Sequence, residues 1–206
     1  MALSWLARLR RRSPPPAEPE VSSPDPPAPF HAMTEGTRAQ WSRILEADAA
    51  FSRDVAGRVL GHLTLLRDDT HGFAVDRLEH ALQTATRAHR AGFDEEYVTC
   101  ALLHDIGAAM SPFEHAAFAA TLLKPYVSEG NHWMVEHHDL FQGYHYLHLM
   151  GGNRNARNRF RGHRHFRQTV EFCDRFDQAA FDPTYDSMPL QAFEPMVRRV
   201  LGQRRR

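Results

Sequence analysis

Apolar residues recur with a helical period through most of the chain after residue 34. Trp41, Ile44 and Leu45 begin an amphipathic stretch, and further apolar residues continue it at three- and four-residue steps as far as Leu66. No segment alternates apolar and polar residues over a length that would indicate a strand. The pattern therefore predicts an all-α protein.

Capping residues and glycines set the predicted helix boundaries. Asp76 followed by Glu79 is a capping-box pattern, and it predicts a helix from Arg77 to about Ala91 that ends at Gly92. The other predicted helices cover residues 95–106, residues 112–124, a short stretch capped by Asn131, residues 165–180 and residues 193–201. Glycines and prolines separate them, so we expect a helical bundle.

The first part of the chain has a different composition. Residues 13–30 contain eight prolines and almost no periodic apolar positions, which is typical of an extended linker. A short arginine-rich stretch precedes it. We therefore predict a disordered N-terminal tail and proline-rich linker over residues 1–33, followed by one helical domain over residues 34–206.

Composition narrows the class of protein only in part. The chain has 25 basic and 25 acidic residues, so its overall charge argues neither for nor against nucleic-acid binding. No apolar run approaches the length of a membrane span. Cys100 and Cys173 are too few for a disulfide framework, which favours a reduced, cytoplasmic setting. The 14 histidines are the unusual feature, because histidine is the commonest metal ligand.

Histidines and aspartates occur within apolar helical stretches, where they need a partner. The pair His104-Asp105 ends the apolar run of residues 98–103, and His80 lies among leucines and alanines. The further members of this set are His115, His138 and Asp177. A divalent metal in the bundle core would satisfy such a set, since it takes imidazole nitrogen and carboxylate oxygen together.

Two segments of the chain, residues 78–83 (LEHALQ) and 101–107 (ALLHDIG), resemble the HD-domain superfamily of helical metal-binding bundles. The resemblance covers roughly residues 60–185, and His80 precedes the His104-Asp105 pair by 24 positions, as that superfamily expects. It implies that the domain at residues 34–206 is an HD-type bundle with its metal site in the bundle core.

The resemblance also implies a ligand set. Members with one metal use the first histidine, the His-Asp pair and a late aspartate. Members with two metals have two additional histidines, which lie in the sequence between the His-Asp pair and the late aspartate. This chain has both additional histidines, so one iron would be bound by His80, His104, Asp105 and Asp177. Asp105 would be shared with a second iron bound by His115 and His138. His137 is the rival of His138, because neighbouring residues face directions about 100° apart on a helix.

Among the two-metal members, the chain is most similar to the diiron oxygenases that oxidise or cleave organophosphonates. The resemblance implies an oxidoreductase that uses two iron ions and dioxygen on a small, hydroxylated, anionic substrate, either organophosphonate-like or polyol-like. The alternative is a metal-dependent phosphohydrolase, with Mn²⁺, Mg²⁺ or Zn²⁺, acting on a nucleotide or small phosphate ester. The third interpretation is a non-catalytic binding or regulatory domain. The sequence leaves open whether the chain forms an oligomer.

The substrate contacts of those relatives are not retained. Thr70 and Phe73 stand where a tyrosine and a glutamate are usual, and Gln142 and Phe181 replace two lysines. The candidate substrate-binding residues here are Gln142, Tyr144, Thr70 and Arg161. Arg161 belongs to a basic segment whose six arginines form a solvated loop, an oligomer contact or an anion-binding flap over the site. Without interleaved aromatic residues, this segment gives nucleic-acid binding little support.

Overall fold

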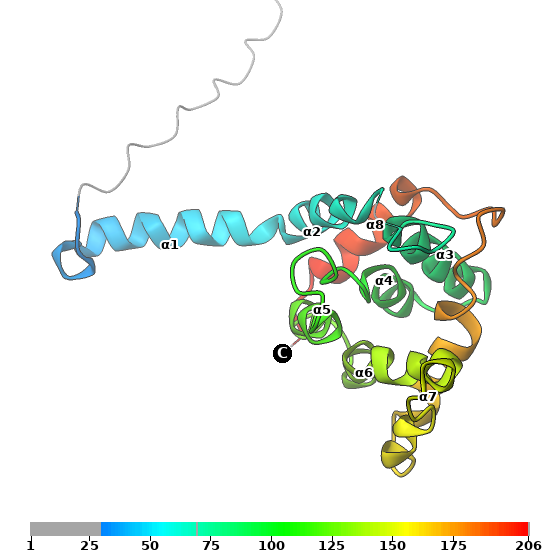
Figure 1. Cartoon of the computed structure of the whole chain (residues 1–206). Helices are drawn as coiled ribbons and strands as arrows, with labels where there is room; N and C mark the ends of the chain where they lie inside the picture. Colours follow the sequence, from blue (N-terminus) through cyan, green and yellow to red (C-terminus); the bar gives the residue numbers. More distant parts are fainter. Residues whose placement is uncertain (1–29, 69, 206) are drawn as a thin grey trace, which may run out of the picture. The chain divides into compact units, whose positions relative to one another are not determined.

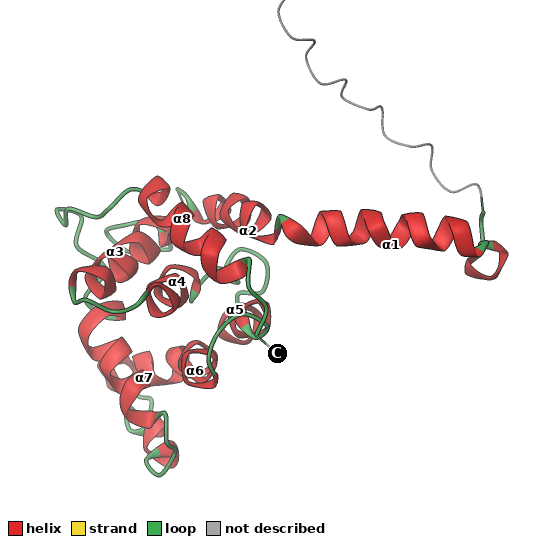
Figure 2. Cartoon of the chain, turned by 180° about the vertical axis from the view of Figure 1, so that it is seen from behind, coloured by secondary structure: helices red, strands yellow, loops and turns green. Residues whose placement is uncertain are grey.

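The structure of the protein is a computed structural model that describes residues 30–68 and 70–205. Within these residues every regular element is helical, which confirms the all-α class (Figure 2). The helices are α1 (Arg38–Arg53), α2 (Val55–Leu63), α3 (Arg77–Arg90), α4 (Glu95–Leu103), α5 (His115–Leu123), α6 (Glu129–Tyr146), α7 (Phe166–Phe172) and α8 (Leu190–Leu201). None of the helices in the described ranges is long and apolar enough to cross a membrane.

The chain divides into two units, residues 1–46 and 47–206. The described part of the first unit contains a 3₁₀ turn, Met33–Glu35, and the first half of α1, which buries no residue. The tail predicted for residues 1–33 lies outside the described residues as far as residue 29. All of the chemistry discussed below belongs to the second unit.

Helix α3 has the boundaries that the sequence predicts. The Asp76 carboxylate accepts a hydrogen bond from the Glu79 backbone N–H at 2.7 Å, and this cap begins the helix. Gly92 follows the helix with φ +82°, a left-handed conformation that glycine adopts without strain. Asp94 then caps α4 by accepting from the Tyr97 N–H at 2.8 Å. These local signals fix the ends of α3 and the start of α4, and the two helices pack against each other.

Helix α4 is the centre of the second unit (Figure 1). It contacts α3, α6 and α8, and every residue from Tyr97 to Leu103 is buried. A helix that is apolar on all sides is typically enclosed by others. The helix ends at Leu103 instead of continuing to Ile106 as predicted, and residues 104–110 form a series of turns. His104 and Asp105 therefore stand at the buried end of the central helix.

Helix α6 corrects the prediction of a short helix capped by Asn131. The cap is Ser128, and the helix continues for 18 residues to Tyr146. The Asn131 side chain instead donates to Glu96 at 2.7 Å and accepts from Gln168 at 2.6 Å. Asn131 thus connects α6 to α4 and α7. Because α6 is long, His138 and Gln142 lie on the same helix and line the same cavity.

The segment predicted as one helix over residues 165–180 is interrupted. Helix α7 ends at Phe172, and residues Cys173–Asp177 form a π-helical turn in which the Gln178 N–H donates to the Cys173 carbonyl at 3.1 Å. A π turn holds one more residue than an α turn and changes the direction of the side chains that follow it. The turn carries Asp177, which is buried.

Three other boundaries differ from the prediction. Asp54 separates α1 from α2, because its side chain caps the second helix by accepting from the Gly57 N–H at 3.2 Å. Helix α5 begins at His115 and not at Pro112, and α8 begins at Leu190, before the predicted Phe193. The change in α5 matters most here, because it makes a predicted metal ligand the first residue of a helix.

Candidate metal centre

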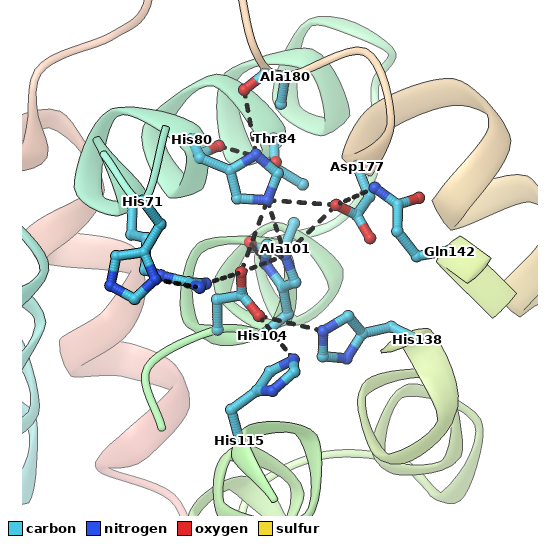
Figure 3. A network of polar contacts seen from close by, with 12 residues as sticks. His71, His80, Thr84, Ala101, His104, His115, His138, Gln142, Asp177 and Ala180 are labelled. Carbon is cyan, nitrogen blue, oxygen red and sulfur yellow. Dashed lines mark hydrogen bonds and ion pairs between the residues drawn. The ribbon is translucent and has the colours of Figure 1, made fainter. Parts of the chain in front are cut away.

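Three predicted ligands from separate elements meet in the core of the second unit (Figure 3). The Nε2 atom of His80 lies 3.2 Å from Nε2 of His104 and 3.2 Å from Oδ1 of Asp177. The distance from His104 Nε2 to the same Asp177 oxygen is 3.6 Å. All three side chains are buried, and they can hold a metal ion between them.

A second group forms around the other side of Asp105. The Nε2 atoms of His115 and His138, both labelled in Figure 3, each lie 3.2 Å from Asp105 Oδ1. The other oxygen, Oδ2, lies 3.8 Å from Nε2 of both His80 and His104. The two oxygens of one carboxylate therefore face two different pairs of imidazoles.

Each of the four imidazoles is oriented by a backbone carbonyl. The Nδ1 contacts are His80 with Ala180 at 3.0 Å, His104 with Ala101 at 2.8 Å, His115 with Pro112 at 3.4 Å and His138 with Val135 at 2.7 Å. A carbonyl accepts hydrogen bonds, so Nδ1 is assigned as the protonated nitrogen in each ring. All four Nε2 lone pairs then point into the centre, which is the orientation that metal-binding histidines require.

This arrangement fits a cation. The lone pairs of His80 and His104 face one another at 3.2 Å, and a buried oxygen of Asp177, Oδ2, has no hydrogen-bond partner among the described residues. Burial would raise the pKa of Asp105, but the neighbouring histidines outweigh it and hold that pKa well below its usual range. Burial lowers the pKa of His80, whereas Asp177 and Asp105 raise it, and the net direction is upward. The centre thus favours positive charge, supplied by a proton or by a metal ion.

Two local features hold these ligands in place. Buried Gln83 clamps the backbone of Asp182, donating to its carbonyl at 2.7 Å and accepting from its N–H at 3.2 Å, which fixes the segment that carries the Ala180 carbonyl. Gly107 lies against the start of α5, where a Cβ atom would come within 2.6 Å of the His115 carbonyl oxygen. Gly107 is therefore required by a close approach of two backbones.

The structure distinguishes between His138 and His137. His137 stacks on Trp133, with ring centroids 4.2 Å apart, and its Nδ1 contacts the Trp133 carbonyl at 3.0 Å. It lies on a different side of α6 from His138, which contacts Asp105. His138 is therefore the member of the pair that, with Asp105 and His104, could hold a metal ion.

A cavity of about 540 Å³ opens onto this centre. The sequence reasoning missed several of the side chains that line it, namely Arg77, Asp139, His145, Tyr146, Met150 and Gln178. One signal was available for Arg77, because it precedes His80 by three positions and so shares its face of α3. The same kind of signal was available for His145, which follows His138 by seven positions on α6.

The predicted substrate contacts have different outcomes. Gln142 lines the cavity and donates to Asp177 Oδ1 at 3.0 Å. Tyr144, Thr70 and Arg161 are not among the described residues that line it. The ring of Tyr144 instead lies under the guanidinium of Arg157 at 3.7 Å.

Of the three interpretations left open for the arginine-rich segment, the structure does not support an anion-binding flap over the cavity. None of the six arginines between residues 154 and 167, all described, lines the cavity. Arg157 is buried and pairs with Asp174 at 3.3 Å, and Arg164 pairs with Glu129 on the surface. The segment uses its arginines for packing and surface ion pairs.

No protein-family model matches the chain, and no curated protein matches it. The geometry of the site is therefore the basis on which a function can be assigned to this chain.

Proposed function

We propose that this protein is an HD-type metalloenzyme that holds two iron ions and uses dioxygen to oxidise or cleave a small, hydroxylated, anionic substrate. The observation that carries the proposal is the position of Asp105. Its Oδ1 faces His115 and His138, while its Oδ2 faces His80 and His104. A carboxylate with a different pair of imidazoles at each oxygen is suited to bridge two metal ions.

The donor set supports iron. His80, His104 and Asp177 would hold one ion and His115 and His138 the other, with Asp105 shared between them. Imidazole and carboxylate together suit iron, and so few protein ligands leave coordination positions free for other molecules. When bound, the irons would supply sites for the substrate hydroxyl and for dioxygen, and would accept the electrons of the oxidation.

The chain's own residues would supply orientation and exclusion of water. The backbone carbonyls at Nδ1 fix each imidazole, so the ligands need no reorganisation on metal binding. Gln142 donates to the Asp177 oxygen that faces His80, which fixes that carboxylate while its own side chain lines the cavity. The ring of Phe181 covers the ring of His80 at 4.4 Å between centroids and shields it from solvent.

The charge of the cavity favours this proposal over a phosphohydrolase that acts on nucleotides. Four aspartates line the cavity against one arginine, Arg77, among the described residues. Four carboxylates, one guanidinium and two divalent ions leave a single net positive charge when the imidazoles are neutral. Polyphosphate binding usually relies on several lysines, arginines or backbone N–H groups, so a substrate of low charge fits better.

Metal analysis and oxygen uptake test the proposal together. Protein purified without chelators should contain two irons per chain and should consume dioxygen when it turns over a hydroxylated anion. His138→Ala should lose one iron, and His137→Ala is the matched control that should keep both. A redox-silent metal, together with phosphate release from nucleotides in the absence of dioxygen, would replace the proposal with the phosphohydrolase.

A further inference from the structure

Arg77 is the one lysine or arginine that lines the cavity in the described part of the chain. It is the first residue of α3, and 26% of its side chain is exposed. One guanidinium nitrogen, Nη2, donates to Nδ1 of His71 at 3.3 Å. The other, Nη1, lies 3.7 Å from Asp105 Oδ2, which is an ion pair but is too long for a hydrogen bond.

The position of Nη1 suits an anion that also reaches the metal centre. Nη1 stands next to Oδ2 of Asp105, the oxygen that faces His80 and His104. If two metal ions neutralise Asp105, the guanidinium beside it loses much of its counter-charge. The Arg77 guanidinium would then be free to donate hydrogen bonds to a carboxylate or phosphonate group of a molecule bound in the cavity. A guanidinium binds such groups in a forked geometry.

An aromatic surface lies on the same cavity. Phe181 stacks on His80 with centroids 4.4 Å apart and planes inclined by 22°, and Phe73 stacks on Phe181 at 4.7 Å and 28°. Both rings line the cavity, and 54% of Phe73 is exposed. Phe73 and Phe181 therefore present a flat apolar surface to the cavity.

From these contacts we infer that Arg77 binds the anionic group of the substrate, and that the substrate is a small monoanion with a flat apolar group that lies against Phe181 and Phe73. The inference depends on the proposed function only for the two metal ions beside Asp105. With two divalent ions bound, the cavity would carry a single net positive charge, which favours a monoanion over a multiply charged substrate.

Calorimetric binding without dioxygen tests this inference on the full, metal-loaded chain with three probes. Mandelate has both a carboxylate and a ring, lactate has the carboxylate without the ring, and 1-phenylethane-1,2-diol has the ring without the charge. We expect mandelate to bind about tenfold more tightly than either of the others, which is the usual worth of a charge-assisted hydrogen bond or a buried ring.

Two variants separate the contribution of the charge from that of the ring, and a third variant serves as a control. Arg77→Gln should weaken mandelate about tenfold and leave the diol unchanged, because only the charge contact is removed. Phe181→Leu should weaken mandelate and leave lactate unchanged. Arg161→Gln changes an exposed arginine that does not line the cavity, and should bind all three probes as the wild type does.

Several results would overturn the inference. Equal binding of mandelate and the diol by the wild type, or an Arg77→Gln variant that binds mandelate normally, removes the anion-binding role. Loss of metal from Arg77→Gln with unchanged helicity would instead assign Arg77 to holding Asp105. Failure of the proposed function is seen separately, in the iron content and oxygen uptake of the wild type, which the probe-binding pattern does not measure.

Discussion

Replacing Gly107 with alanine should remove one metal ion from the site and leave the other in place. Gly107 lies in the turns after α4 and contacts the first turn of α5. A Cβ at this position would lie 2.6 Å from the His115 carbonyl oxygen, 2.9 Å from His115 Cα and 2.8 Å from Phe118 Cβ. Two of these atoms belong to the backbone, so no change of rotamer relieves the contact.

The required movement follows from these distances. Ordinary contact with a Cβ begins at 3.4 Å, so the His115 backbone must retreat by about 0.8 Å. A metal site tolerates changes of only about 0.2 Å in ligand distances, so His115 would leave its place opposite Asp105. The overpacking itself should destabilise the fold by about 1–3 kcal/mol. His80, His104 and Asp177 lie on other elements and should keep their metal.

Iron content and thermal unfolding of purified Gly107→Ala measure both effects. The content should fall from two irons per chain to one, and the melting temperature should fall. Gly61→Ala is the matched control, because a Cβ on this exposed glycine of α2 meets nothing within 4 Å. It should keep both irons and gain about 0.4–1 kcal/mol of stability. A Gly107→Ala variant with two irons and wild-type stability would refute the reasoning.

Three other predictions follow from the structure. His138→Ala should bind one iron fewer than the wild type while His137→Ala binds the full number, as measured by elemental analysis, because only His138 contacts Asp105. Chelation of the metals should lower the melting temperature, by an amount equivalent to about 2.7 kcal/mol when free metal had been present at 100 times its Kd. An unchanged melting temperature after complete chelation would contradict this. Burial raises the pKa of Glu96, but hydrogen bonds from Ser128 and Asn131 outweigh it, and the net pKa is lowered. A lowered folded pKa contributes stability above the unfolded value of about 4.3 and loses it as the pH falls. Denaturant unfolding should therefore find Glu96→Gln less stable than the wild type at pH 7, with the difference shrinking towards pH 3.

The helix boundaries that depend on local chemistry were predictable from the sequence. Asp76, Asp94 and Gly92 act within a few residues of their own positions, so their patterns gave the beginning of α3 and α4 and the end of α3. Helix α6 was not predictable in the same way. Its polar residues obscure the apolar period, and Asn131, which resembles a cap, uses its side chain in tertiary hydrogen bonds with Glu96 and Gln168.

The composition of the metal-ligand group was predictable, whereas the cavity beside it was not. His80, His104 and Asp105 stand out because buried polar residues need partners. The structure brings the four predicted histidines around the Asp105 carboxylate and places Asp177 beside His80 and His104. The wall of the cavity depends on how α3, α6 and the π turn pack together. The helical period gave a signal for Arg77, but it did not show that the Tyr144 ring lies against Arg157 and not along the cavity.

The central claim is that Asp105 lies between two metal ions, and anomalous diffraction at the iron absorption edge tests it most directly. Crystals of the protein as purified should show two anomalous peaks on opposite sides of the Asp105 carboxylate. One peak should lie among His80, His104 and Asp177, and the other beside His115 and His138. A single peak, or two peaks of which neither contacts Asp105, would contradict the claim.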